Sequence, residues 1–206
     1  MCSICGKLSK KALCKKCEIK LNKEFTYQEE SYLKHEEKNF IKHHYFFRYE
    51  NLIRNQIIAL KFKEKPYVYK TIGEFLENKQ KSFENLRKYD IILVAPISNK
   101  RKKERGYNQS ELIAKEISKI IGVKIEKNIL YKTKNILPQS TLNKEQRIEN
   151  VKNVYKAKNI EKIKNKKILI FDDIYTTGST VNECAKILVE AGISKNSIEI
   201  LTLAKD

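Results

Sequence analysis

Two adjacent carboxylates and the hydroxyl-rich loop after them are the residues of this chain best suited to bind a ligand. Asp172 and Asp173 directly follow an apolar run, 168–171, typical of a strand buried on both faces of a parallel sheet. The loop leads into an amphipathic segment, 181–191, predicted to be a helix. Amide groups at a helix N-terminus bind phosphate, and carboxylates accept hydrogen bonds from sugar hydroxyls. We therefore predict a phosphoribosyl site, with Asp172 and Asp173 at the ribose and catalytic in any transfer. Five loop residues would bind the phosphate: Thr176, Thr177, Gly178, Ser179 and Thr180.

Other motifs that combine acidic or phosphate-binding residues fit this stretch less well. A Walker A loop requires a lysine after its last glycine, whereas Ser179 follows Gly178. The Gly-x-Gly-x-x-Gly pattern of dinucleotide-binding folds is absent. A response-regulator receiver needs a far longer chain after its acidic pair than follows Asp173 here. A purely structural Asp pair in a buried strand stays open as an alternative, although adjacent carboxylates are costly to place there without a ligand.

Arginines supply the second group of candidate ligand-binding residues. Only 6 of the 43 basic residues are arginine, and three of these lie in two predicted loops: Arg101, Arg105 and Arg147. The planar guanidinium group binds phosphate with two parallel hydrogen bonds, which lysine does not match. We predict that these arginines and the neighbouring Gly106 contact a diphosphate. Surface ion pairs are the alternative for each arginine.

Four cysteines predict a metal site near the N-terminus. Cys2, Cys5, Cys14 and Cys17 have the spacing Cys-x2-Cys-x8-Cys-x2-Cys, and four thiolates complete the tetrahedral shell of a structural Zn2+. The surrounding segment has little apolar content and would depend on the metal for its fold. Two disulfides are the alternative, which a reducing compartment disfavours. Cys184 lies on the apolar side of the predicted helix 181–191 and is expected in the core.

Composition indicates one domain with a small appendage. The 206 residues carry a formal net charge of +18, which favours a polyanionic partner such as nucleic acid. The alternative is a codon-biased surface, since nearly all the basic residues are lysine. No apolar run has the length of a membrane span and no signal peptide is recognisable, so we expect a soluble, cytoplasmic protein without membrane insertion.

The elements that would position these residues alternate between strands and helices. The pattern predicts an α/β fold with a parallel sheet flanked by helices. Strands are expected at 44–49, 91–95, 123–131, 167–171 and 198–203, helices at 20–42, 52–63, 68–79, 108–121 and 181–191, and loops at 96–105 and 132–150. The expected organisation is a cysteine knuckle (1–22), a helical linker and lead-in segment (23–85) and the α/β core (86–206).

Several segments together resemble known phosphoribosyltransferase-like proteins. The stretch 168–180 resembles the diphosphoribose-binding motif of type I phosphoribosyltransferases. Residues 102–109 (Lys-Lys-Glu-Arg-Gly-Tyr-Asn-Gln) resemble the Arg-x-Arg-Gly-Phe-Asn-Gln element of the competence-associated ComF family, with Lys102 where the first arginine is often found. The remaining similarities to that family are the segment 49–54, the knuckle, and Lys61, Phe62, Lys132, Thr133, Gln139, Arg147 and Asn150.

This resemblance implies a type I phosphoribosyltransferase-like fold with a zinc-bearing N-terminal segment. It also implies a part in DNA uptake during natural transformation, acting on single-stranded DNA with a helicase-like competence protein. The second hypothesis is an active phosphoribosyltransferase that transfers ribose 5-phosphate from phosphoribosyl diphosphate to a base or amine. In that case Mg2+ would accompany the diphosphate. No segment of the sequence identifies an acceptor site, so the two hypotheses stay open.

Overall fold

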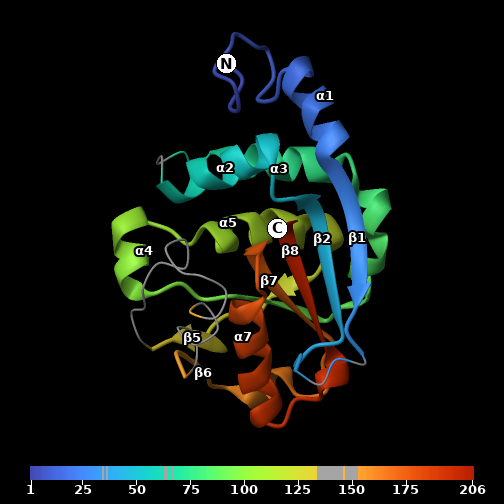
Figure 1. Cartoon of the computed structure of the whole chain (residues 1–206), viewed down its shortest axis with the longest axis vertical. Helices are drawn as coiled ribbons and strands as arrows, with labels where there is room; N and C mark the ends of the chain where they lie inside the picture. The colour runs from blue at the N-terminus through green and yellow to red at the C-terminus, as the bar shows by residue number, and fades with distance from the viewer. Residues whose placement is uncertain (34, 36, 63–64, 66, 134–145, 147–152) are drawn as a thin grey trace.

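The computed structural model describes residues 1–33, 35, 37–62, 65, 67–133, 146 and 153–206 (Figure 1). A six-stranded sheet has the order β1-β2-β8-β7-β3-β4, in which β1 is antiparallel to β2 and the other pairs are parallel. The strands are β1 (Phe25–Ser31), β2 (Lys42–Arg48), β3 (Ile91–Val94), β4 (Lys124–Ile125), β7 (Ile168–Tyr175) and β8 (Ile198–Lys205). A separate antiparallel pair joins β5 (Leu130–Lys132) and β6 (Tyr155–Ala157).

Helices cover both faces of this sheet, as the alternating α/β pattern predicts. Strand β7 shows the two-sided burial: Leu169 and Phe171 pack into one apolar cluster, while Ile168 and Ile170 pack into the other. The first cluster includes α2 (Asn51–Phe62), α3 (Val68–Glu77), η1 (Gln80–Lys88) and α5 (Gln109–Ile121), and the second includes α7 (Ser179–Glu190) and η3 (Ile160–Ile163). Cys184 is fully buried in the second cluster, which confirms its core role.

The N-terminal segment lies at one end of the molecule, beyond α2 (Figure 1). Its cysteine-bearing loops lead into α1 (Lys15–Glu24), which packs against α2. The Glu24 carboxylate accepts hydrogen bonds from the amides of Leu52 and Ile53 at 3.1 and 3.0 Å, so it caps the N-terminus of α2. Within the described residues, no helix is long and apolar enough to cross a membrane.

Three predicted elements were wrong in part. The helix predicted over 20–42 ends at Glu24, because the aromatic and hydroxyl-bearing residues that follow form β1. The loop predicted over 96–105 contains α4 (Asn99–Arg105), whose N-terminus is capped by the Ser98 hydroxyl. The strand predicted over 123–131 divides into β4 and β5, since Asn128 between them has a positive φ of 61°.

Three further details differ from the prediction. The lead-in segment 23–85 contains β1 in addition to the strand predicted over 44–49, which β2 confirms, and both strands join the main sheet. Strand β7 continues to Tyr175, four residues past the apolar run, and pairs with β8 along this length. The last strand, β8, likewise extends to Lys205. The predicted loop 132–150 lies almost entirely outside the described residues.

Candidate functional site

The topology of the sheet indicates that a ligand-binding site lies at the carboxyl ends of β3 and β7. From β3 the chain crosses through α5 to β4, and from β7 it crosses through α7 to β8 in the opposite direction along the sheet. The neighbours β3 and β7 therefore form the switch point, and open α/β sheets bind ligands outside the carboxyl ends of such strands. A cavity of about 530 Å³ lies there. It is lined by the ends of β3 and β7, the end of α2, α4 and the first turn of α7.

The two predicted carboxylates both line this cavity, as the last part of β7. Asp173 is only 4% exposed, and its Oδ2 lies 2.8 Å from the Lys61 ammonium and 3.4 Å from Gln109 Nε2. Asp172 Oδ1 accepts hydrogen bonds from the Ser110 hydroxyl at 3.0 Å and from the Asp173 amide at 2.9 Å. The α2 and α5 helices thus hold the acidic pair in place.

Electrostatic repulsion from its neighbour alters the titration of Asp172. Burial and the charge of Asp173 raise the pKa of Asp172 above its ordinary value, against the opposing effects of Lys61 and the Ser110 hydroxyl. A buried carboxyl that is hard to ionise is typical of functional sites. A ligand that donates hydrogen bonds from hydroxyl groups, or that brings a positive charge, would favour the ionised form of this acidic pair.

The loop predicted to bind phosphate begins a helix with a glycine at its N-cap, a geometry compatible with an anion site. Gly178 occupies the N-cap position of α7 with a positive φ of 72°. A Cβ on Gly178 would lie 2.6 Å from Tyr175 Cε2, so only glycine fits at this position. Four of the five predicted loop residues line the cavity at the positive end of the α7 dipole: Thr176, Gly178, Ser179 and Thr180. The fifth, Thr177, does not line it and instead shares a hydrogen bond of 2.9 Å with the Ser179 hydroxyl.

Basic side chains form the opposite wall. Arg101 and Arg105 of α4, two of the residues predicted to contact a diphosphate, line the cavity, and Arg105 donates to Gln109 Oε1 at 2.9 Å. The Arg105 guanidinium also lies 5.2 Å from the centre of the Phe62 ring. Burial and the charge of Arg101 lower the pKa of Arg105. Lys132 is a further cavity residue, and the same two causes lower its pKa to about 8.

Of the predicted diphosphate residues, one described residue does not line the cavity and another lies outside the described residues. Gly106 ends α4 in the left-handed conformation, with a φ of 75°, and does not line the cavity. Its role in the described structure is to turn the chain from α4 towards α5. Arg147 lies outside the described residues, as do Gln139 and Asn150 of the family-like spacing.

Several cavity residues were not assigned to the site from sequence. Lys61, Gln109 and Lys132 occur in the family-like motifs, and this was the only signal that pointed to them. Ser110 contacts Asp172, and Tyr155 lines the cavity under Lys132, whose ammonium lies 5.2 Å from the ring centre. Neither residue belongs to a pattern visible in the sequence.

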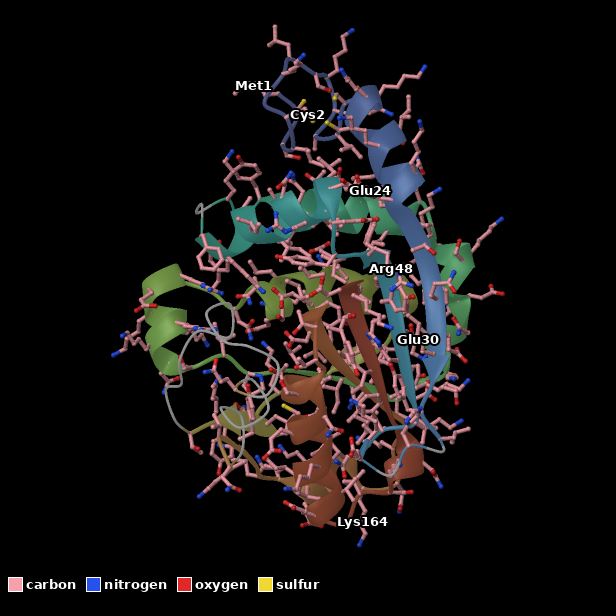
Figure 2. All side chains as sticks on the ribbon, viewed as in Figure 1. Met1, Cys2, Glu24, Glu30, Arg48 and Lys164 are labelled. Carbon is pink, nitrogen blue, oxygen red and sulfur yellow. The ribbon has the colours of Figure 1, made fainter. Side chains whose placement is uncertain are left out.

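The four N-terminal cysteines converge as predicted. The sulfur atoms of Cys2, Cys5, Cys14 and Cys17 all lie within 4.8 Å of one another. The Cys5 and Cys14 sulfurs are 3.8 Å apart, which equals the edge of about 3.8 Å expected for a tetrahedron with Zn–S bonds of 2.3 Å. Figure 2 shows sulfur atoms gathered near Cys2 at the end of the molecule opposite Lys164. Four thiolates without an open position fit a structural zinc ion.

Comparisons with known proteins agree with the fold of the C-terminal half of the chain. Residues 107–206 match the family model described as a phosphoribosyl transferase domain. The chain is 28% identical over 153 residues to competence protein F of Haemophilus influenzae, an alignment that covers 72% of this chain and 66% of that protein.

Two further relatives have names of the same kind. Competence protein ComFC of Streptococcus pneumoniae is 27% identical over 152 residues, covering 74% of this chain and 64% of that protein. DNA utilization protein YhgH of Escherichia coli is 30% identical over 103 residues, covering 50% of this chain and 44% of that protein. In each of these three comparisons the aligned part spans less than two thirds of the relative's length.

Proposed function

Because this chain belongs to the ComF family of phosphoribosyltransferase-like proteins, we propose that it is a DNA-uptake protein that binds phosphoribosyl diphosphate and single-stranded DNA. Relatives named for competence and DNA utilization support the role in uptake. The observation that supports phosphoribosyl diphosphate as the ligand is the spatial order of hydrogen-bonding groups at the carboxyl end of β7. Asp172 and Asp173 are followed at once by the Gly178 loop and the positive end of α7, all lining one cavity.

The proposed binding mode assigns each part of the ligand to one wall. The 5′-phosphate binds the amides and hydroxyls of the loop at the start of α7, where the helix dipole favours negative charge. The ribose hydroxyls donate to Asp172 and Asp173. Arg101 and Arg105 contact the diphosphate, and Mg2+ arrives with the diphosphate as its counterion. Lys61 neutralises Asp173 at 2.8 Å and so limits repulsion between the acidic pair and the diphosphate.

The nucleic-acid part of the proposal rests on charge and on the relatives. With 43 basic and 25 acidic residues, the protein attracts polyanions at long range. We propose that it acts in the cytoplasm on incoming single-stranded DNA, together with a helicase-like competence protein. The zinc knuckle has a structural role in this proposal, because four cysteine ligands leave no position for a substrate.

Transferase activity is a second candidate, and the aromatic side of the cavity favours it. Tyr49, Phe62 and Tyr107 line the cavity together with the acidic pair. Flat rings suit a planar base as acceptor. In this reaction the bond between ribose C1 and the diphosphate oxygen breaks, a C1–nitrogen bond forms, and the acceptor nitrogen loses a proton. The arginines would stabilise the departing diphosphate by electrostatics.

Titration calorimetry with a ligand series tests the binding proposal. Phosphoribosyl diphosphate with Mg2+ should bind the wild-type chain more tightly than ribose 5-phosphate or diphosphate alone. Only the whole ligand contacts the loop at the start of α7, the acidic pair and the arginines at once. Equal affinity for inorganic diphosphate and phosphoribosyl diphosphate would reject ribose recognition. Release of diphosphate in the presence of a panel of bases and amines tests the transferase candidate, and no release with any acceptor would leave the binding function alone.

A further inference from the structure

A second cavity, of about 570 Å³, lies between the zinc knuckle and α2. We call it the knuckle cleft. One wall is formed by the cysteine-bearing loops and the start of α1, and the other by the face of α2 that carries Leu52, Asn55, Gln56 and Ala59. This α2 wall is separate from the phosphoribosyl cavity, to which α2 contributes Lys61 and Phe62.

The knuckle cleft differs from the phosphoribosyl cavity in its charge. Its lining includes four exposed lysines and no carboxylate: Lys7, Lys16, Lys20 and Lys65. In the part of the chain that the structure describes, none of these lysines forms an ion pair. The phosphoribosyl cavity, by contrast, contains Asp172, Asp173 and Glu104. The knuckle cleft therefore carries uncompensated positive charge that attracts a polyphosphate backbone, whereas the charges of the phosphoribosyl cavity are mixed.

The side-chain amide of Gln56 lies at the floor of the cleft and offers hydrogen bonds in addition to the charge of the lysines. Gln56 is only 6% exposed and lines the cleft, yet its side chain has no hydrogen-bond partner among the described residues. The Gln56 carboxamide makes no hydrogen bond within the described residues, and its polar atoms are not among those sealed from solvent, so they are available to a ligand in the cleft. A carboxamide both donates and accepts hydrogen bonds, as the exposed edges of nucleobases do. The neighbouring Asn55 offers the same chemistry at the cleft's exposed side.

The two walls of the cleft are fixed relative to each other. The Ser3 hydroxyl lies 2.7 Å from the Thr71 hydroxyl and joins the knuckle to α3. At the other end of α1, Glu24 caps α2 through the amides of Leu52 and Ile53. The zinc ligands hold the loops between these two attachments. A preformed cleft of this kind binds without the entropic penalty of ordering its walls.

We propose that the knuckle cleft is the binding site for single-stranded DNA, with its lysines on phosphates and Gln56 and Asn55 on base edges. The inference rests on the proposed function and specifies where the DNA binds. Two of the most exposed aromatic side chains flank Lys65 in sequence: Phe62 is 65% and Tyr67 is 48% exposed. Exposed rings of this kind are suited to stacking on bases, and Phe62 also lines the phosphoribosyl cavity.

Fluorescence anisotropy with a labelled oligothymidylate of about 20 nucleotides, long enough for one binding site, tests this placement on the zinc-loaded chain. The cleft variant is Lys7→Glu/Lys16→Glu/Lys20→Glu. Its matched control is Lys156→Glu/Lys162→Glu/Lys164→Glu, which makes the same change in net charge on exposed residues. Figure 2 shows Lys164 at the end of the molecule opposite the knuckle. Zinc content and thermal unfolding are measured for both variants, and phosphoribosyl diphosphate binding is measured in parallel.

The cleft variant should bind the oligonucleotide at least tenfold more weakly than the control variant. Its log–log salt dependence should flatten by about 2, because three lost phosphate contacts release fewer counterions at about 0.7 each on a single strand. Gln56→Leu should weaken binding about threefold or more without lowering thermal stability, since the Gln56 amide makes no hydrogen bond within the described residues that the substitution would remove.

Equal weakening in the cleft and control variants would overturn the inference while leaving the DNA-binding function in place. Unaltered binding by Gln56→Leu would overturn the base contacts. Absence of oligonucleotide binding by the wild-type chain at low salt would reject the DNA part of the proposed function itself. Binding of phosphoribosyl diphosphate should persist in every variant, because none of the altered residues lines that cavity.

Discussion

Replacing Asp172 with asparagine should stabilise the protein at neutral pH and weaken ligand binding. In the wild type, burial and the charge of Asp173 raise the pKa of Asp172 in the folded state, while in the unfolded chain it titrates near its ordinary value of about 3.9. Asparagine removes the buried charge, and its carbonyl oxygen keeps the hydrogen bonds from Ser110 and the Asp173 amide. Each unit of raised pKa corresponds to about 1.4 kcal/mol, so a rise to a pKa of about 7 sets an upper bound of about 4 kcal/mol. Because Asp172 lines an open cavity where water screens its charge, we expect a gain of about 1–2 kcal/mol at pH 8.

The pH dependence of this gain identifies its cause. A carboxyl with a raised folded pKa binds more protons in the folded state, so wild-type stability falls as pH rises from the unfolded pKa through the folded one. The advantage of Asp172→Asn should therefore be largest above the folded pKa, shrink by pH 5 and vanish near pH 4. Thermal unfolding between pH 5 and 8 measures it, with an expected increase in Tm of about 2–8 °C at pH 8.

Asp173→Asn is the matched control, because the same substitution one residue later should have the opposite effect. Asp173 is buried and pairs with Lys61 at 2.8 Å, so its loss removes the direct ion-pair partner of a largely buried ammonium and leaves it only the more weakly interacting Asp172. We expect a loss of about 1–3 kcal/mol. If Asp172→Asn is no more stable than wild type at pH 8, or if its advantage does not depend on pH, the repulsion inferred at the acidic pair is wrong.

Three further predictions concern the loop, the metal and the arginines. Gly178→Ala should lower both thermal stability and ligand affinity, since its Cβ meets the Tyr175 ring at a positive φ; calorimetry showing wild-type affinity would contradict this. Cys14→Ser should sharply reduce bound zinc, and a native preparation with intact thiols but no zinc, measured by elemental analysis, would reject the metal site. Arg101→Ala should weaken diphosphate-containing ligands about tenfold while leaving ribose 5-phosphate almost unchanged, and an equal effect on both ligands would place Arg101 elsewhere.

Local patterns in the sequence predicted most of the core and the acidic loop. The buried run 168–171, the helix that begins after Gly178 and the helix that follows Asn108 each have a periodicity or cap that the structure confirms. The four-cysteine spacing also predicted a cluster that the structure brings together. In these cases the signal lies within a few residues of the element that it specifies.

The parts that the sequence did not predict depend on contacts between distant segments. Strand β1 is half-exposed and polar, and only its pairing with β2 makes it a strand. Lys61 pairs with Asp173 although the two residues are more than a hundred positions apart in the chain, and no local sequence pattern predicts that pairing. The knuckle cleft likewise requires the packing of α1 on α2, so its four lysines appear in the sequence as ordinary surface charges.

A crystal structure of the protein with phosphoribosyl diphosphate and Mg2+ tests the central claim most directly. We predict that the 5′-phosphate lies within hydrogen-bond distance of the amides and hydroxyls at residues 176–180, and that the ribose hydroxyls contact Asp172 and Asp173. The diphosphate should face Arg101 and Arg105. A ligand bound away from this loop, or a cavity that stays empty at millimolar ligand, would contradict the assignment of a phosphoribosyl diphosphate site.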